Sequence, residues 1–245
     1  MIRVLVFIVA MMATSGIAGA QGFPTDILNV PVDGSAAAWI VRTFGLLTVL
    51  SIAPGILIMV TSFPRFAIAF AILRSGMGLG TTPSNTILVS LALFMTFYVM
   101  SPTFDRAWRE GIDPLLANQI TEAEALPRIA EPFRQFMQAN TRPKDLQLFV
   151  DIAQEKGQTV VTNDVVDLRA LIPAFMISEI RRGFEIGFLI LLPFLVIDLI
   201  VATITMAMGM MMLPPTSISL PFKILFFVLI DGWNLMVGSL VRSFN

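Results

Sequence analysis

The sequence predicts an all-α, membrane-associated protein built of helical hairpins with broken helices and a small helical domain outside the membrane. The first observation is composition: 56% of the 245 residues are hydrophobic, 13% are charged, and the mean hydropathy is +0.82. Soluble globular domains carry about 25% charged residues, so this balance is typical of a membrane-associated chain. The second observation is a set of four apolar segments. The third is a single polar stretch that holds most of the charge.

Each apolar segment is close to the ~20 residues that a helix needs to cross a bilayer. The segments run roughly from Phe44 to Phe70, Thr86 to Phe104, Phe184 to Leu213, and Leu220 to Val241. None is a clean span: the first, third and fourth contain Pro54, Pro64, Arg65, Pro193, Asp198, Lys223 and Asp231. Such breaks are tolerated at membrane depth where backbone and charge face protein or water. We therefore expect these helices to be buried among partner helices.

The domain prediction follows the charge. Residues 1–20 are expected to be a cleavable signal peptide, because Arg3 precedes an apolar run and Ala18-Gly19-Ala20 resembles a cleavage site. An uncleaved first transmembrane helix is the alternative. Residues 21–104 are expected to carry the first hairpin, and residues 171–245 the C-terminal hairpin with its methionine-rich loop. Residues 105–170 form the polar domain, since 19 of the 33 charges lie between Asp105 and Arg169.

Charge also predicts the orientation. The connection from Arg65 to Asn85 carries Arg65 and Arg74 without an acidic residue, which favours the cytoplasmic side. The polar domain is then periplasmic, in agreement with a cleaved signal peptide, and the chain is expected in the inner membrane of a bacterium with two membranes. Both mature termini would lie outside, and the methionine turn would face inward.

The absence of two residue types narrows the function. The chain contains neither cysteine nor histidine, which removes disulfides, thiolate chemistry, histidine bases and the usual zinc or haem ligands. We expect no enzyme, no cofactor and no metal. The net charge of −1 without a basic patch also argues against nucleic-acid binding.

A first group of ionisable candidates lies between Pro173 and Gly187. On a helix Glu179 shares a face with Gly183, and Arg181 forms an i,i+4 pair with Glu185. One hypothesis is a helix start at the membrane interface with self-paired charges, which is favoured for Arg181. The other is a set of ion pairs between subunits that fixes the register of an assembly, which is favoured for Glu179. The glycines of Gly183-x-x-x-Gly187 also predict close helix packing.

A second group consists of Asp198 in the third apolar segment with Lys223 and Asp231 in the fourth. An ionised group in hydrocarbon costs roughly 2.5–3.5 kcal/mol even on a lenient scale. If the two segments form a hairpin, Asp198 is expected to pair with Lys223. A proton relay through the membrane carboxylates is the alternative hypothesis.

Five methionines stand among the seven residues Met206 to Met212, shortly before Pro214-Pro215. Methionine is flexible and polarizable, so a cluster at a turn between membrane helices predicts a compliant seal. Copper binding through Met206 and Met210 at i,i+4 is one alternative, and ordinary helix packing is another. Packing explains the run poorly, because Met210, Met211 and Met212 in succession cannot all face one core.

Several motifs in order resemble the FliP family of type III secretion export gates, which has flagellar and virulence members. They are Thr61-Ser62-Phe63-Pro64-Arg65-Phe66, Leu91 to Thr96, Pro173 to Gly187, Leu192 to Asp198, Met208 to Met212 with Pro214-Pro215, and Leu220-Pro221-Phe222-Lys223 running to Asp231-Gly232-Trp233. The resemblance covers roughly Ile40 to Phe104 and Leu171 to the end, and the flagellar version is the closer match.

The resemblance implies a core pore-forming subunit that conducts unfolded flagellar proteins across the inner membrane at the flagellar basal body. It implies a helical ring of several copies, five in the family's pattern, with two other export-gate membrane proteins, further export-apparatus proteins and the exported substrates as partners. Met208, Met210, Met211 and Met212 would form a gasket around the pore. It also places the apparent spans inside a protein assembly above the usual bilayer plane, which disagrees with a simple four-span topology.

A multi-spanning small-solute or ion transporter is the alternative function. Such a protein is expected to show repeats and a polar site at mid-membrane, whereas the two pairs of apolar segments differ in loop length, motif and charge. An intramembrane protease ranks below both, because no serine stands beside a plausible base.

Overall fold

A computed structural model describes residues 34–162, 165–210 and 214–244. The predicted signal peptide, and Met211 and Met212 of the methionine run, lie outside the described residues. The described elements are helices, apart from β1 (Val161–Thr162) and β2 (Val165–Val166), which form one short antiparallel pair. The prediction of an all-α fold is confirmed. The chain forms two compact units, residues 1–53 and 54–245.

The first unit is described over residues 34–53, all of which belong to α2 (Gly34–Met59). This helix ends in the second unit, and α3 (Phe63–Met77) begins a few residues later with Pro64 in its first turn. Proline is favoured there, because the first amides of a helix have no intrahelical acceptor. The apolar segment predicted from Phe44 to Phe70 is therefore two helices, not one continuous span.

Two described helices are long and apolar enough to cross a membrane. One is α4 (Asn85–Ala107), which continues through the π-helical turn η2 (Trp108–Ile112) into α5 (Asp113–Leu116). The other is the 40-residue α8 (Leu168–Ala207). It begins at Leu168, not near Phe184, because Asp167 caps it by accepting a hydrogen bond from the Arg169 amide at 2.9 Å.

The last predicted segment is bent. Helices α9 (Pro215–Leu229) and α10 (Gly232–Arg242) meet at 63° and give a third candidate span only if they are counted together. Asp231 stands at the bend in the left-handed conformation, with φ of 50°, which ends one helix before the next begins. By length and composition, the described residues thus hold two spans, or three with the bent pair, where the sequence predicted four.

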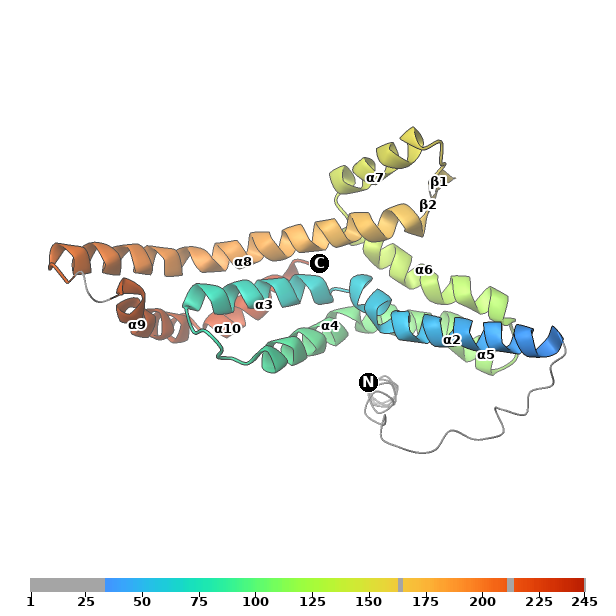
Figure 1. The fold of residues 1–245 in the computed structure, drawn as a ribbon, viewed down its shortest axis with the longest axis horizontal. Helices are drawn as coiled ribbons and strands as arrows, with labels where there is room; N and C mark the ends of the chain where they lie inside the picture. The colour runs from blue at the N-terminus through green and yellow to red at the C-terminus, as the bar shows by residue number, and fades with distance from the viewer. Residues whose placement is uncertain (1–33, 163–164, 211–213, 245) are drawn as a thin grey trace, which may run out of the picture. The chain divides into compact units, whose positions relative to one another are not determined.

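Helices α3 and α8 lie side by side and run in the same direction (Figure 1). Their contacts advance by four residues on both helices, from Ile68 opposite Gly183 to Ile72 opposite Gly187. A β-carbon built on Gly183 would lie 3.1 Å from Cβ of Ile68, and one on Gly187 would lie 2.8 Å from Cδ1 of Ile72. The two glycines therefore allow the close approach expected of a G-x-x-x-G motif.

An apolar core joins α3 and α8 to α4, α9 and α10. Its fully buried members are Phe66, Ala69, Phe70, Leu73, Met77, Leu88, Ala92, Phe194, Phe227, Met236 and Leu240. Phe194 of α8 meets both Phe226 and Phe227 of α9, with ring centroids 6.2 and 6.1 Å apart. Edge-on and tilted aromatic pairs of this kind add to the gain from burial, and they hold α9 against the second half of α8.

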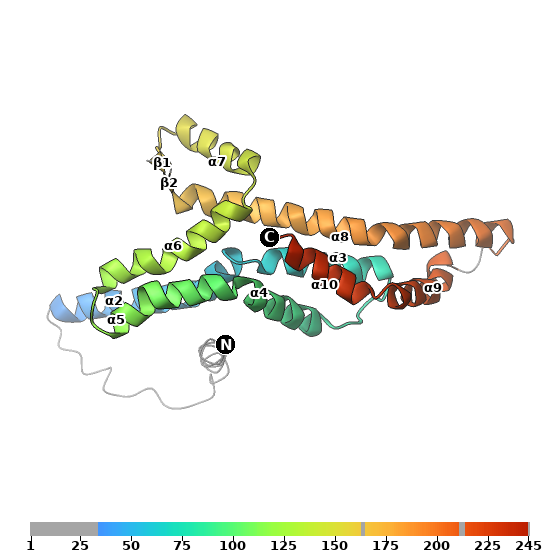
Figure 2. The ribbon, with the colours of Figure 1, turned by 180° about the vertical axis from the view of Figure 1, so that it is seen from behind.

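The polar stretch is also helical, and Figure 2 shows its helices at the end of α8 where that helix begins. Helices α6 (Glu122–Asn140) and α7 (Pro143–Glu155) enclose a second core with β1, β2 and the first turns of α8. The buried members are Val60, Met137, Val150, Ala153, Val160, Val166, Ala170, Leu171 and Phe175. The periplasmic location of this polar domain stays a prediction.

Candidate functional site

An ion pair between Arg65 at the start of α3 and Glu179 in α8 is buried between the two helices. The two residues are 1% and 0% exposed. Nε of Arg65 donates to Oε2 of Glu179 at 3.0 Å, and Nη2 donates to Oε1. This bidentate arrangement satisfies both carboxylate oxygens, which is the geometry that makes a buried charge pair tolerable.

The end of the chain completes the surroundings of Arg65. Nη1 of Arg65 donates to the carbonyl oxygen and to Oγ of Ser243, at 3.0 and 2.7 Å. The guanidinium carbon lies 3.5 Å from the ring centroid of Phe244, within the range of a cation–π contact. The Phe244 ring also stacks on Phe66 and on Phe136 of α6. The Arg65 site therefore connects α3, α6, α8 and the C-terminal segment.

Ser178 makes the next connection on α8. Its hydroxyl donates to Oδ2 of Asp145 at 2.7 Å and accepts a hydrogen bond from the Arg142 amide at 3.1 Å. Ser178 and Asp145 are buried. Adjacent residues of α8 therefore hold the start of α7 and the start of α3.

A second internal pair joins α8 to α9. Nζ of Lys223 donates to Oδ2 of Asp198 at 2.5 Å and to the carbonyl oxygen of Gly76 at 3.0 Å. Ser219 donates to Oδ1 of Asp198 at 2.5 Å. The expected hairpin thus brings Asp198 and Lys223 together. Both charges are neutralised inside the chain, and the part that this pair plays in assembly stays a prediction.

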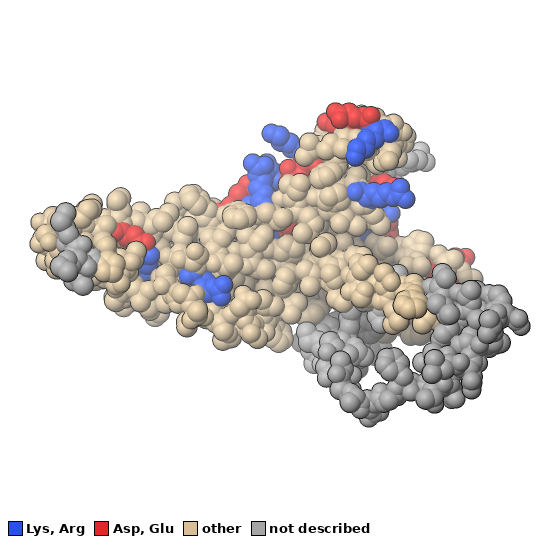
Figure 3. All heavy atoms as spheres, in the orientation of Figure 1, with Lys and Arg blue, Asp and Glu red and all other residues tan. Residues whose placement is uncertain are grey.

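A third group of charges lies on the surface of α8. Oε1 of Glu185 is 3.4 Å from Nε of Arg181 and 3.8 Å from Nη1 of Arg142, and Oε2 is 4.0 Å from Nη1 of Arg182. Figure 3 shows charged side chains gathered over α7 and the neighbouring part of α8, whereas α8 further along is almost entirely uncharged on this face. The i,i+4 pair of Arg181 and Glu185 is present, with both side chains about half exposed.

Asp231 does not join the pair of Asp198 and Lys223. Its Oδ2 accepts a hydrogen bond from Asn234 at 3.1 Å at the exposed bend before α10. Among the described residues no lysine or arginine lies within ion-pair distance of it. The local turn explains this, since the Asp231 side chain bonds the helix that follows it.

The methionine-bearing turn begins with a defined helix end. Gly209 has φ of 73°, its amide donates to the carbonyl oxygen of Met206 at 3.0 Å, and the Met210 amide donates to that of Thr205 at 3.1 Å. These two bonds make a Schellman motif. Glycine, not the double proline, therefore ends α8, and Pro215 instead occupies the first position of α9. Met206 and Met208 are 60% and 65% exposed.

Arg65, Ser243 and Phe244 were not expected beside Glu179. A lone glutamate in the apolar run Pro173 to Ile180 indicates that a cation lies near, but nothing in the spacing identifies it. At the break Phe63-Pro64-Arg65, Arg65 places a positive charge at the start of another apolar helix. The pairing of α3 with α8 brings the two together. Whether Glu179 also acts between subunits stays a prediction.

Comparison with known proteins identifies the chain's relatives. The model of the FliP family matches residues 46–240. The flagellar biosynthetic protein FliP of Rhizobium meliloti is 83% identical over 244 residues, which cover 100% of both chains. The protein of the same name from Agrobacterium fabrum is 78% identical over 245 residues, again covering 100% of both. That of Bacillus subtilis is 48% identical over 205 residues, or 83% of this chain and 91% of its own length. The chain therefore belongs to the FliP family.

Proposed function

We propose that the chain is a core pore-forming subunit of the flagellar type III protein export gate, which conducts unfolded flagellar proteins across the bacterial inner membrane. Membership of the FliP family makes it a structural component of flagellar biosynthesis and not an enzyme. The proposal adds a ring of five copies with two other membrane proteins of the gate, at the flagellar basal body, with the polar domain in the periplasm.

The observation that carries the proposal is the uncovered apolar face of α8. The exposed large apolar residues on this helix and its end are Ile177, Ile180, Phe184, Phe188, Leu189, Leu192, Leu195, Val196, Leu199, Ile200, Ile204, Met206 and Met208. Helix α9 adds Phe222, Ile224, Leu225, Val228 and Leu229. Exposed apolar side chains along such a length of helix mark a membrane or protein contact, and a ring of copies covers part of this face with neighbouring subunits.

The internal ion pairs support packing in an assembly. Glu179 and Asp198 lie in a long apolar helix, and each carboxylate is neutralised by a cation of its own chain. A subunit with its buried charges already paired brings apolar surfaces to its neighbours without the cost of burying free charges. This favours a structural role for both carboxylates over a proton relay.

The methionine-bearing turn supports the gasket. Gly209 ends α8 so that Met206 and Met208 are exposed at the tip of the hairpin formed by α8 and α9. Several copies would bring Met208, Met210, Met211 and Met212 together around one axis. Thioether side chains adapt to varied neighbours, so such a ring closes on itself when empty and yields to a passing polypeptide.

The test replaces Met208, Met210, Met211 and Met212 with alanine in the assembled complex. We expect ion conductance of the reconstituted complex to rise several-fold while assembly is preserved, because alanine leaves the ring too small to close. Met59→Ala, which removes an exposed methionine elsewhere, is the matched control and should leave conductance unchanged. An assembled quadruple variant with unchanged conductance contradicts the gasket.

The alternative of a small-solute or ion transporter is tested by the same preparation. A transporter is expected to purify as a monomer or dimer that binds its solute, whereas the gate is expected as a large ring with partner subunits. The pairing of Lys223 with Asp198 also weakens this alternative, since it leaves neither charge of the pair free for a solute.

A further inference from the structure

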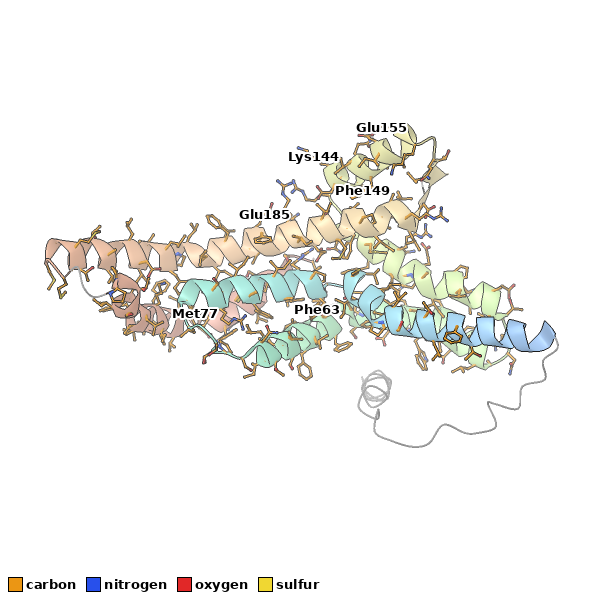
Figure 4. The ribbon with its side chains drawn as sticks, viewed as in Figure 1. Phe63, Met77, Lys144, Phe149, Glu155 and Glu185 are labelled. Carbon is orange, nitrogen blue, oxygen red and sulfur yellow. The ribbon has the colours of Figure 1, made fainter. Side chains whose placement is uncertain are left out.

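Three arginines converge on one carboxylate where α7 begins beside α8. Arg142, Arg181 and Arg182 lie within 3.4–4.0 Å of the Glu185 carboxylate. Nη1 of Arg142 is shielded from solvent and has no hydrogen-bond partner among the described residues. Figure 4 places Lys144 of α7 on the same outer side of α8 as Glu185. The cluster therefore has more positive charge than its single carboxylate neutralises.

Stability of the chain does not account for this arrangement. Side-chain exposure is 52% for Arg181, 50% for Arg182 and 48% for Glu185. Ion pairs at such exposure contribute little to stability, because water and salt screen them. A single arginine would also neutralise Glu185. The additional arginines are better explained by an anion that the chain binds here.

An apolar groove begins one helical turn further along α8. Phe184 and Phe188 follow Arg181 at i+3 and i+7 and so share its face. Together with Leu191, Leu195, Ile72 and Leu220, they line a groove of about 860 Å³ between α8, α3 and α9. Lys223 and Asp198 also line it and are paired with each other, so the groove presents mainly apolar surface to an occupant.

We propose that this cluster and groove bind an anionic phospholipid. The phosphate lies among Arg181, Arg182 and Arg142, and an acyl chain lies in the groove below Phe184. Guanidinium groups bind phosphate oxygens through paired, charge-assisted hydrogen bonds. The adjacent apolar groove distinguishes a lipid from free phosphate, which has nothing to place there.

The position on α8 agrees with a lipid headgroup. Arg181, Arg182 and Glu185 are the last charged residues before an apolar run to Ala207 in which only Asp198 is charged. A change from clustered arginine to apolar surface on one helix face is typical of the level at which a helix enters the hydrocarbon of a membrane. The inference goes beyond the export function and does not depend on it.

The experiment measures lipid retention by the full-length protein, purified with its assembly partners in mild detergent. Phosphatidylglycerol or phosphatidylcholine is added, and bound lipid is counted by native mass spectrometry. We expect selective retention of phosphatidylglycerol. Arg181→Gln with Arg182→Gln should weaken its binding several-fold, because each substitution removes charge-assisted hydrogen bonds to the phosphate.

Two further variants separate the contributions. Arg169→Gln removes an exposed arginine from the start of the same helix and should leave retention unchanged. Leu195→Glu places a charge in the groove and should reduce retention of phosphatidylglycerol without changing the affinity for inorganic phosphate. Added salt should weaken binding, because the arginines are partly exposed.

Four results would overturn the proposal. Equal retention of both lipids, or undiminished retention by the arginine double variant, excludes an anionic headgroup site. Displacement by inorganic phosphate alone, with no effect of Leu195→Glu, shows a free-anion site instead. Loss of the ring in the arginine double variant, in a complex that binds no phosphatidylglycerol, shows that a second copy of the chain occupies this face.

Discussion

Two ion pairs on the same helix differ in how completely they are enclosed. At the first, Arg65 and Glu179 are both almost fully buried, and the guanidinium is held by a carboxylate, a serine and an aromatic ring. At the second, Lys223 is 5% exposed but Asp198 is 30% exposed, beside an apolar groove. The first pair is bidentate, and the second joins one ammonium to one carboxylate oxygen.

The difference indicates different tasks. Removing one partner of an enclosed pair leaves an uncompensated charge that water cannot reach, so the Arg65 site is expected to determine whether α3, α8 and the C-terminal segment stay together. At the Lys223 site water can reach the carboxylate, so the pair contributes less to stability. Its partial exposure in the groove makes it sensitive to whatever packs there. The following variants test this contrast, beginning with the largest effect.

Glu179→Gln should cost about 3–5 kcal/mol of folding free energy, because the Arg65 charge stays buried without its counter-charge. Thermal unfolding of the detergent-solubilised protein measures the loss. The double variant Arg65→Met with Glu179→Gln should recover part of it by removing the unpaired charge. A loss for Glu179→Gln no larger than that for Asp198→Asn would contradict the contrast.

Asp198→Asn should cost about 1–3 kcal/mol, the usual cost of leaving a buried partner unsatisfied. The cost is smaller than for Glu179 because the carboxylate is partly solvated. We also expect a lower yield of assembled complex, measured by size-exclusion chromatography, since α9 loses the ion pair of Lys223 with α8. Normal yield combined with a selective loss of proton coupling would instead favour a proton relay.

Phe244→Ala should cost about 1–2 kcal/mol by removing the ring that faces the buried guanidinium. The measurement is again thermal unfolding, with Phe244→Leu as the matched variant that keeps apolar volume but loses the cation–π contact. If alanine and leucine have the same effect, the aromatic ring, through Arg65 and its stacking on Phe66 and Phe136, explains the whole contribution of this residue. If leucine has no effect, the Phe244 ring does not stabilise the Arg65 site as an aromatic group.

The smallest effect is expected at an exposed carboxylate, that of Glu124 in the capping box at the start of α6. Hydrogen bonds from the amide and hydroxyl of Thr121 to Glu124 hold the pKa of Glu124 below its usual value. Because the folded pKa is lowered, this contribution is present above the ordinary glutamate pKa and is lost as pH falls through the folded pKa. Hydrogen exchange at the Thr121 amide should follow that titration, and Glu124→Gln should abolish its pH dependence.

The sequence predicts local features of this fold better than long-range pairings. Asp198 and Lys223 lie on consecutive apolar helices, so a hairpin is enough to bring them together. Arg65 and Glu179 meet only because α3 and α8 run in parallel after a long intervening stretch. The glycines at 183 and 187 indicate that a helix approaches closely, but they do not identify α3 as that helix.

Hydropathy also hides short breaks. The segment from Leu220 to Val241 is apolar enough to suggest one helix, yet Asp231-Gly232 is a dipeptide typical of turns, and the helices bend there by 63°. At the other break, Pro64 starts a new helix inside an apolar segment. Hydropathy averaged over a membrane-length window reports side-chain polarity. It carries no information on the backbone conformation that causes these bends.

Helix α8 has a mechanical consequence. Its 40 residues give a length of about 60 Å, twice the ~30 Å hydrocarbon thickness of a bilayer. One continuous helix therefore runs from the core that it shares with α6 and α7 to the methionine-bearing turn. A tilt imposed on the polar end is therefore expected to move the tip as well, with Pro193 as the point inside α8 where the helix bends most easily, because proline donates no backbone hydrogen bond.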